Sequence, residues 1–298
     1  MLPLECAELS LAGLSVGDAF GERFFLHAQI AQSMIQHRAL PKEPWPFTDD
    51  TNMALSIYAT LRIHQEISQD YLAQSFAEHY DLGRGYGAAM HGLLRRLTGG
   101  EDWRLAANSL FEGQGSFGNG AAMRVAPIGA YFASDLDRVV HEATKSAEVT
   151  HAHPEGIAGA VAVAVAAACA VNCRGNDVTR QAFIDIVLPY VPDSEVRSGI
   201  KRARDIQTTH VEHVVAMIGN GYQITAQDTV PFTLWCAGEE ISSFEDAMWL
   251  TASGLGDIDT NCAIVGGIVS LYVGYDDVPD DWLDKREALP QWAFEDTA

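Results

Sequence analysis

Apolar residues recur with helical spacing in several long segments of the chain. In residues 51–67, apolar side chains fall on overlapping turns, and residues 71–79 and 244–252 are amphipathic with the same period. Residues 261–273 are apolar and contain glycines that suit close helix packing. These patterns predict four helices, each with apolar side chains placed for burial on one or more faces.

The segment 157–171 is the most apolar of the chain and consists almost entirely of Ala, Val and Gly. Pro154 stands before it at a position typical of a helix start, so we expect a buried core helix. Loops are expected at residues 40–47, 98–101 and 113–120, and few segments alternate with strand period. We therefore predict an all-α fold, a compact multi-helix orthogonal bundle.

No linker or charge block divides the 298 residues, so we predict one domain spanning residues 1–298. From about residue 276 the chain becomes polar and rich in proline, which predicts a surface segment at the C-terminal end. The N-terminus lacks a basic segment, so a signal peptide is not expected. Five cysteines without a CxxC motif favour buried thiols in a reduced, cytoplasmic protein.

The charge balance is strongly acidic, with 40 Asp and Glu against 19 Lys and Arg and a formal charge of -21. This excess argues against binding to duplex DNA, to an RNA backbone or to an anionic membrane, all of which require a cationic face. An anionic small molecule remains a possible ligand where a metal or backbone N–H groups reverse the local field.

The first acidic motif, Thr48-Asp49-Asp50-Thr51, directly precedes a predicted helix. One such residue is enough to cap a helix, whereas two adjacent carboxylates repel each other unless a cation neutralises them. Capping and cation binding are both open interpretations of this motif taken alone.

The second acidic motif, Gly256-Asp257-Ile258-Asp259-Thr260, also precedes an apolar helix. An Asx-turn with a cap explains it if it is considered alone. Together the two motifs offer four carboxylates, which balance two divalent cations, and all-oxygen ligands suit Mg²⁺ or Mn²⁺ rather than Zn²⁺. The carboxylates would have to outweigh the positive end of each helix dipole.

Two further segments contain candidate substrate contacts. Residues 113–124 are dense in glycine, which lets a backbone approach an anion closely, but they match neither a Walker loop nor a Rossmann fingerprint. A mobile loop leading into a helix is the alternative. The segment from Thr150 to Pro154 contains His151 and His153, and we favour a substrate contact by His151 over metal ligation.

The segment from Gly17 to Glu22 places two carboxylates among small residues. Asp18 is a candidate structural anchor and Glu22 a candidate acid or base. Solvated carboxylates on a helix are the alternative for both.

The segments GDAFG, TDDT, GSFGNGAAMRVAPIG, THAHP and GDIDT occur in this order, and AQDTVPFTLWC lies between the last two. This series resembles the ADP-ribosylglycohydrolases, the family that includes dinitrogenase reductase-activating glycohydrolase, over residues 13–274. Each motif is weak alone, but five in register are specific.

The resemblance implies an all-α fold with a central site for two divalent cations, Mg²⁺ or Mn²⁺. It also implies hydrolysis of an N- or O-glycosidic bond between ADP-ribose and an acceptor, either a protein side chain or a small molecule. The residues that match the metal-ligand motifs are Thr48, Asp49, Asp50, Asp257, Asp259 and Thr260. The residues that match the substrate-binding segments are Gly115, Ser116, Phe117, Gly118, Asn119, Gly120 and His151.

The sequence departs from the family pattern at two places, the second acidic motif and the position of Glu22. The second motif usually is GGDTDT, and here Leu255 and Ile258 replace a glycine and a threonine, neither at a ligand position. Some members carry a catalytic Glu a few residues beyond GDxxG, whereas here Glu22 follows Gly21 immediately. Either Glu22 or a ligand carboxylate such as Asp259 is the candidate that accepts the proton of the attacking water.

Two other functions fit parts of the pattern. The carboxylate set alone also suits a two-metal phosphohydrolase acting on a nucleotide. A non-catalytic ADP-ribose-binding module is the third possibility, although intact ligand motifs argue against it. The acceptor, the preferred metal and the oligomeric state are left open by the sequence.

Overall fold

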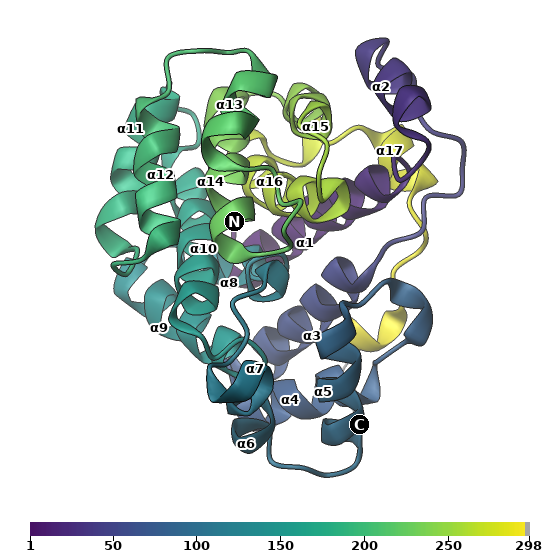
Figure 1. Ribbon diagram of the computed structural model, residues 1–298, viewed down its shortest axis with the longest axis vertical. Helices are drawn as coiled ribbons and strands as arrows, with labels where there is room; N and C mark the ends of the chain where they lie inside the picture. The colour runs from purple at the N-terminus through teal and green to yellow at the C-terminus, as the bar shows by residue number, and fades with distance from the viewer. Residues whose placement is uncertain (296–298) are drawn as a thin grey trace.

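The computed structural model describes residues 1–295, and within them the chain forms α-helices and short 3₁₀ turns without a β-strand (Figure 1). The all-α prediction is therefore confirmed. The helices of the first half are α1 (Pro3–Glu22), α2 (Ala28–Gln36), α3 (Asp49–His64), α4 (Gln69–Glu78), α5 (Ala88–Thr98), α6 (Trp103–Asn108), α7 (Leu110–Gly113) and α8 (Ala126–Tyr131).

The second half of the chain continues in the same way, with helices packed across one another around a central pair, α10 and α16 (Figure 1). The helices of this half are α9 (Leu136–Glu148), α10 (Pro154–Cys173), α11 (Arg180–Val187), α12 (Glu195–Asp205), α13 (Val211–Ile218), α14 (Ala226–Glu239), α15 (Phe244–Ser253), α16 (Ile258–Val273) and α17 (Asp280–Lys285).

The four helices predicted from hydrophobic spacing are present as α3, α4, α15 and α16. Helices α3 and α16 begin two and three residues earlier than predicted, because Asp49 and Asp50 belong to the first turn of α3 and Asp259 to that of α16. Helix α3 ends earlier than predicted, at His64, because Gln65 adopts a left-handed conformation with φ of 58°.

Helix α10 is the core helix expected from the Ala/Val run. By length and composition alone it is apolar enough to cross a membrane, but 78% of its most apolar window is buried by neighbouring helices. Its small side chains let α8, α9, α14 and α16 pack around it. Burial by protein on these sides agrees with the predicted core helix.

A seam of small residues joins α1 to α16 and was not predicted. A Cβ on Gly17 would lie 2.1 Å from the carbonyl oxygen of Cys262, and a Cβ on Gly13 would lie 2.4 Å from that of Gly266. Glycine at these positions therefore permits a backbone approach that any larger residue would block. The seam continues to Gly21 beside Asp259, so it places the end of α1 against the start of α16.

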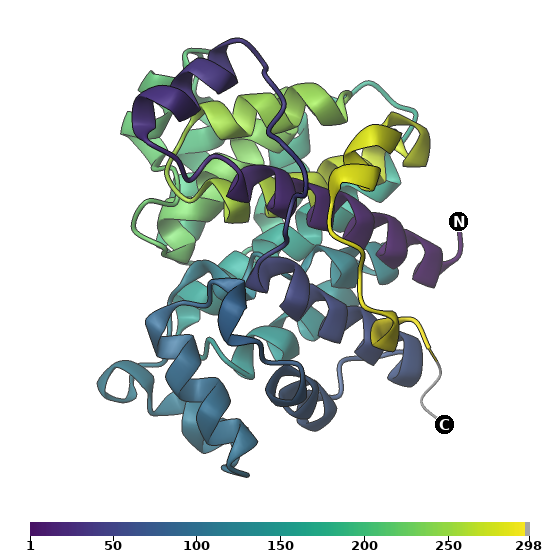
Figure 2. The same ribbon diagram turned by 90° about the vertical axis from the view of Figure 1, so that its right-hand side faces the viewer.

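Most residues of the C-terminal segment lie at or near the surface, but a few buried side chains anchor it to the rest of the protein. Trp282 is buried and stacks on Phe20 with ring centroids 4.6 Å apart. The backbone N–H of Trp45 donates to Lys285, and the N–H of Glu287 donates back to Trp45, both at 2.9 Å. Figure 2 shows the segment running from α1 down towards α3. Aromatic side chains hold it, although its average composition is polar.

Candidate active site

Three carboxylates from three helices meet at one point of the structure. Oxygen atoms of Asp18 on α1, Asp50 on α3 and Asp259 on α16 all lie within 4.8 Å of one another. The glycine seam between α1 and α16 and the packing of α1 on α3 bring these helices together. Residues distant in sequence therefore form one acidic cluster.

Asp18 is the structural anchor of this cluster, as the sequence suggested. Its carboxylate accepts hydrogen bonds from the backbone N–H and the hydroxyl of both Thr48 and Thr51, with the Thr48 hydroxyl at 2.8 Å. Burial raises the pKa of Asp18, whereas these donors lower it. The two threonines of the first acidic motif thereby fix its geometry relative to α1.

Asp50 and Asp259 each leave one buried carboxylate oxygen, Oδ1, without a hydrogen-bond partner among residues 1–295. Burial and then the neighbouring carboxylates raise the pKa of both groups, and the same causes raise the pKa of Asp49 to about 8. Buried like charges are costly unless a cation neutralises them. The cluster therefore fits a hard divalent cation, for which carboxylate and hydroxyl oxygens are suitable ligands.

Helix capping explains only part of the two acidic motifs. Thr48 is the N-cap of α3 and its hydroxyl accepts from the N–H of Asp50 at 3.4 Å. Asp257 occupies the N-cap position of α16 but makes no capping bond. Its carboxylate instead accepts from the Asn119 side-chain amide at 2.6 Å. This contact ties the second acidic motif to the glycine-rich segment.

A cavity of about 380 Å³ joins the acidic residues to the glycine-rich segment and His151. The predicted site residues that line it are Asp49, Asp257, Asp259, Thr260, Ser116, Phe117, Gly118, Asn119, Gly120 and His151. The remaining predicted residues, Thr48, Asp50, Gly115 and Glu22, do not line the cavity. Asp50 belongs to the acidic cluster, and the Thr48 hydroxyl contacts the carboxylates of Asp18 and Asp50.

The glycine-rich segment is a shaped loop whose form depends on two close approaches. Gly115 has a φ of 77°, and a Cβ there would lie 2.7 Å from the backbone nitrogen of His153. Gly120 faces His151, since a Cβ on it would lie 2.8 Å from Cε1 of the imidazole. Glycine is therefore required for the backbone conformation at the first position and for space at the second.

The cavity has an apolar rim that the sequence motifs did not predict. Phe111 and Ile224 line it and are 50% and 59% exposed. Both adopt left-handed backbone conformations, with φ of 50° and 56°. Such conformations are unusual for bulky side chains and persist mainly where the surrounding structure holds the backbone in place. The available signal was the apolar pair Leu110-Phe111, which only Glu112 separates from the glycine-rich segment.

Glu22 lies at the end of α1 beside the acidic cluster. A Cβ on the preceding Gly21 would lie 2.6 Å from Cα of Asp259, so the two backbones touch at this point. Glu22 is half-buried, and burial followed by the Asp18 carboxylate raises its pKa. A carboxylate with a raised pKa near a reaction centre is a candidate acid or base.

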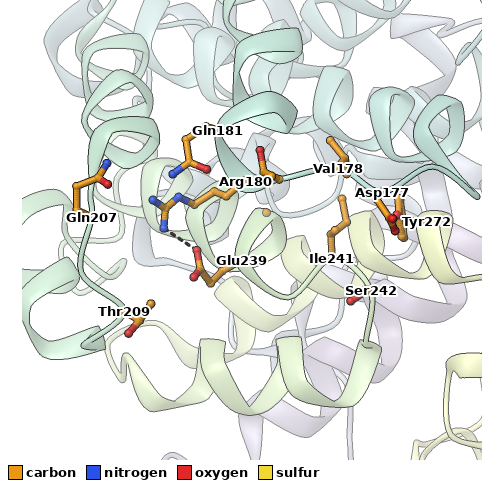
Figure 3. Close-up of a pocket in the computed structure, with 12 residues that line it drawn as sticks. Asp177, Val178, Arg180, Gln181, Gln207, Thr209, Glu239, Ile241, Ser242 and Tyr272 are labelled. Atoms are coloured by element: carbon orange, nitrogen blue, oxygen red, sulfur yellow. Dashed lines mark hydrogen bonds and ion pairs between the residues drawn. The ribbon is translucent and has the colours of Figure 1, made fainter.

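Another hollow, of about 440 Å³, lies away from these residues (Figure 3). Arg180 and Glu239 lie across it, and Nη1 of Arg180 donates to Oε2 of Glu239 at 2.6 Å. No residue of either acidic motif or of the glycine-rich segment lines it. The charges of Arg180 and Glu239 are paired with each other.

Comparison with known proteins agrees with the motifs and the fold. The human ADP-ribosylhydrolase ARH3 is 28% identical over 94% of this chain and 89% of its own length. An uncharacterized protein of Archaeoglobus fulgidus is 33% identical, covering 95% and 93% of the two chains. The ADP-ribosylarginine hydrolase Tri1 of Serratia proteamaculans is 25% identical, covering 95% and 75%.

A solved structure described as an ADP-ribosylglycohydrolase-related protein complex has the same fold. It superposes with a TM-score of 0.69 and 22% identity, over 96% of this chain and 93% of that chain. The family model for ADP-ribosylglycohydrolases matches residues 6–297 of this chain. By the extent of this match, the chain belongs to the ADP-ribosylglycohydrolase family.

Proposed function

We propose that this protein is a divalent-cation-dependent hydrolase of the glycosidic bond between ADP-ribose and an acceptor. The observation that carries the proposal is the single cavity that joins unneutralised carboxylates to a glycine-rich loop and an apolar rim. The carboxylates, the loop and the rim each suit one part of ADP-ribose. The family membership and the names of the relatives support the same reaction.

The cavity provides complementary contacts along its length. Backbone N–H groups at Ser116 and Phe117 suit a diphosphate, because the neighbouring glycines let an anion approach the backbone. The rim at Phe111 and Ile224 offers apolar surface for a flat base. The carboxylates of Asp49, Asp257 and Asp259 also line the cavity, and the reacting ribose would be held beside them.

The residues that would hold the cations are those of the two acidic motifs, with Asp18 as their support. When bound, divalent cations would orient the ribose hydroxyls and make water a better nucleophile. Glu22 or Asp259 would accept the proton of that water as the glycosidic bond breaks. The raised pKa of Glu22 favours it for this role, because proton transfer is most effective near the working pH.

The acceptor is tested directly by a substrate panel. Purified protein is incubated with ADP-ribosylated arginine, serine and thymidine substrates, with Mg²⁺ or Mn²⁺ and with EDTA. Release of free ADP-ribose from at least one substrate, and its loss in EDTA, are the expected results. Inorganic phosphate or AMP would indicate a phosphohydrolase instead, and no product with retained ADP-ribose binding would indicate a binding module.

A further inference from the structure

Arg124 is a buried cation that the proposed reaction does not use. It ends the glycine-rich segment, is fully buried, and forms no ion pair with any carboxylate in residues 1–295. Its guanidinium lies over the ring of Phe76, with 4.6 Å between Cζ and the ring centroid. A buried, unpaired charge is expensive, so its retention calls for an explanation.

The hydrogen bonds of Arg124 lead to the cavity. Its Nη2 donates to the backbone carbonyl of Ser146 at 3.0 Å and to the hydroxyl oxygen of Thr150 at 2.8 Å. The Thr150 hydroxyl in turn lies 2.7 Å from Nδ1 of His151. These contacts form a chain from the buried cation to a histidine that lines the cavity.

The direction of the last hydrogen bond follows from counting donors. The Thr150 hydroxyl has one proton, and in the described structure its only other hydrogen bond is the one it accepts from Arg124. If His151 donated to this oxygen, the hydroxyl proton would be buried without an acceptor. The satisfied arrangement has Thr150 donating to Nδ1, and Arg124 strengthens that donor by polarising the hydroxyl.

The tautomer of His151 is therefore determined. Because Nδ1 accepts, the neutral ring carries its proton on Nε2. Burial, and next the charge of Arg124, lower the pKa of His151 to about 3, which keeps the ring neutral.

Nε2 faces the glycine-rich loop. A Cβ on Gly118 or Gly120 would lie 3.3 Å or 3.0 Å from this atom. Nε2 has no hydrogen-bond partner within the part of the chain that the structure describes. Its N–H is thus available on the cavity side.

We propose that Arg124 and Thr150 are positioning residues that fix His151 as the Nε2–H tautomer, a neutral hydrogen-bond donor for an oxygen of the bound ligand. His151 then cannot act as a general base, since its only basic nitrogen is occupied by Thr150. The identity of that ligand as ADP-ribose rests on the proposed function, whereas the tautomer does not.

The tautomer is tested by NMR on the whole protein labelled with ¹⁵N at histidine, and His151→Gln assigns the His151 signals among the ten histidines. The expected result is a protonated Nε2 and an unprotonated Nδ1 at neutral pH, before any ligand is added. A protonated Nδ1, or a doubly protonated ring, would overturn the proposal. This outcome is independent of whether the protein hydrolyses anything.

The roles of the positioning residues are tested with Thr150→Val and its rescue variant Thr150→Ser. Thr150→Val should give exchange-averaged ring signals and bind ADP-ribose about five- to tenfold more weakly, because one fixed donor is lost. Thr150→Ser should restore both the ring signals of the single tautomer and the ADP-ribose affinity. Thr251→Val, which removes a buried hydroxyl bonded to Ala247, is the matched control for a purely structural loss and should change neither.

Arg124→Met should also release the ring, and its melting curve shows whether it is folded. Thr150→Val keeps the inference testable if that variant is not. Unchanged ring signals and unchanged affinity in Thr150→Val would overturn the role of the chain. If wild-type protein does not bind ADP-ribose, the proposed function fails, and the NMR result still decides the tautomer.

Discussion

Two hollows of the described structure, the candidate active site and the hollow of Figure 3, differ in how the charges beside them are balanced. In the hollow of Figure 3, the guanidinium of Arg180 is matched by the carboxylate of Glu239, although Nε of Arg180 has no partner. At the candidate active site, Asp259, which lines the cavity, and its neighbour Asp50 each have one carboxylate oxygen without a hydrogen-bond donor among residues 1–295. This uncompensated charge distinguishes the candidate active site.

The same contrast applies to stability and function. A matched buried pair needs no further partner, so it holds helices together. A buried cluster of like charges opposes folding and is stable only if something binds to it.

Asp259→Asn should lower the hydrolytic rate by at least the roughly 10²–10⁴-fold typical of losing a general base, because the variant also loses a cation ligand. It should not lower the melting temperature of metal-free protein, since it removes one of several repelling charges. Initial rates at saturating substrate and limiting Mg²⁺ measure the effect. The exposed Asp193→Asn is a matched control, and a near-wild-type rate for Asp259→Asn would exclude Asp259 as a ligand.

Glu22→Gln should lower the rate by about 10²–10⁴-fold with little change in ADP-ribose affinity, because the amide keeps the shape but cannot accept the proton. Single-turnover hydrolysis and an ADP-ribose titration separate the chemical step from binding. An unchanged rate would transfer the role to a carboxylate of the acidic cluster. Weaker binding with an unchanged chemical step would make Glu22 a substrate contact.

Removal of divalent cations should destabilise the protein in a pH-dependent way. The folded-state pKa values of Asp49, Asp50 and Asp259 are raised above those of the unfolded chain, to about 8 for Asp49. The folded state therefore binds more protons between about pH 4 and pH 8, and stability falls as the pH rises through this window. In EDTA, the melting temperature should decrease over that range.

Mg²⁺ should remove this decrease, because it binds the ionised carboxylates of the folded state. A concentration one hundred times the dissociation constant adds about 2.7 kcal/mol of stability. Differential scanning calorimetry of protein verified to be metal-free measures both effects. Melting temperatures indifferent to EDTA and to Mg²⁺ at pH 8 would contradict cation binding by the cluster.

Glu239→Gln, in the other hollow, should leave the hydrolytic rate within about twofold of wild type. It should lower the free energy of unfolding by about 1–3 kcal/mol, because the buried Arg180 loses its charged partner. Urea denaturation and the standard activity assay measure the two quantities. If this variant lost activity while remaining folded, charge balance would not separate the two hollows.

Much of the site was predictable because its chemistry is local in the sequence. The two acidic motifs contain more carboxylates than a helix cap needs, and the glycine-rich segment contains more glycines than a turn needs. Most of the predicted contacts indeed line one cavity. Helices were predictable where apolar residues recur with helical spacing, as in α15, or form a long apolar run, as in α10, whereas α1 is buried nearly all round and gave no amphipathic signal.

The unpredicted parts of the site depend on partners far apart in the chain. Asp18 joins the acidic cluster because the glycine seam draws α1 onto α16, 240 residues away along the chain, and neither segment shows this alone. Trp282 fills a gap between aromatic side chains of α1 and the loop before α3, so a locally polar segment becomes an anchor. The average composition of a segment does not reveal packing of this kind.

The sequence by itself determined the helical fold class, the acidic motifs and the flexible glycine-rich backbone, because hydrophobic period and residue chemistry act over a few neighbouring residues. The tertiary structure decided which carboxylates share a site, which oxygens lack partners, and how Arg124 reaches His151 through Thr150. Those properties depend on distances of a few ångströms between helices. Such distances are set by the close packing of the whole core rather than by any one segment.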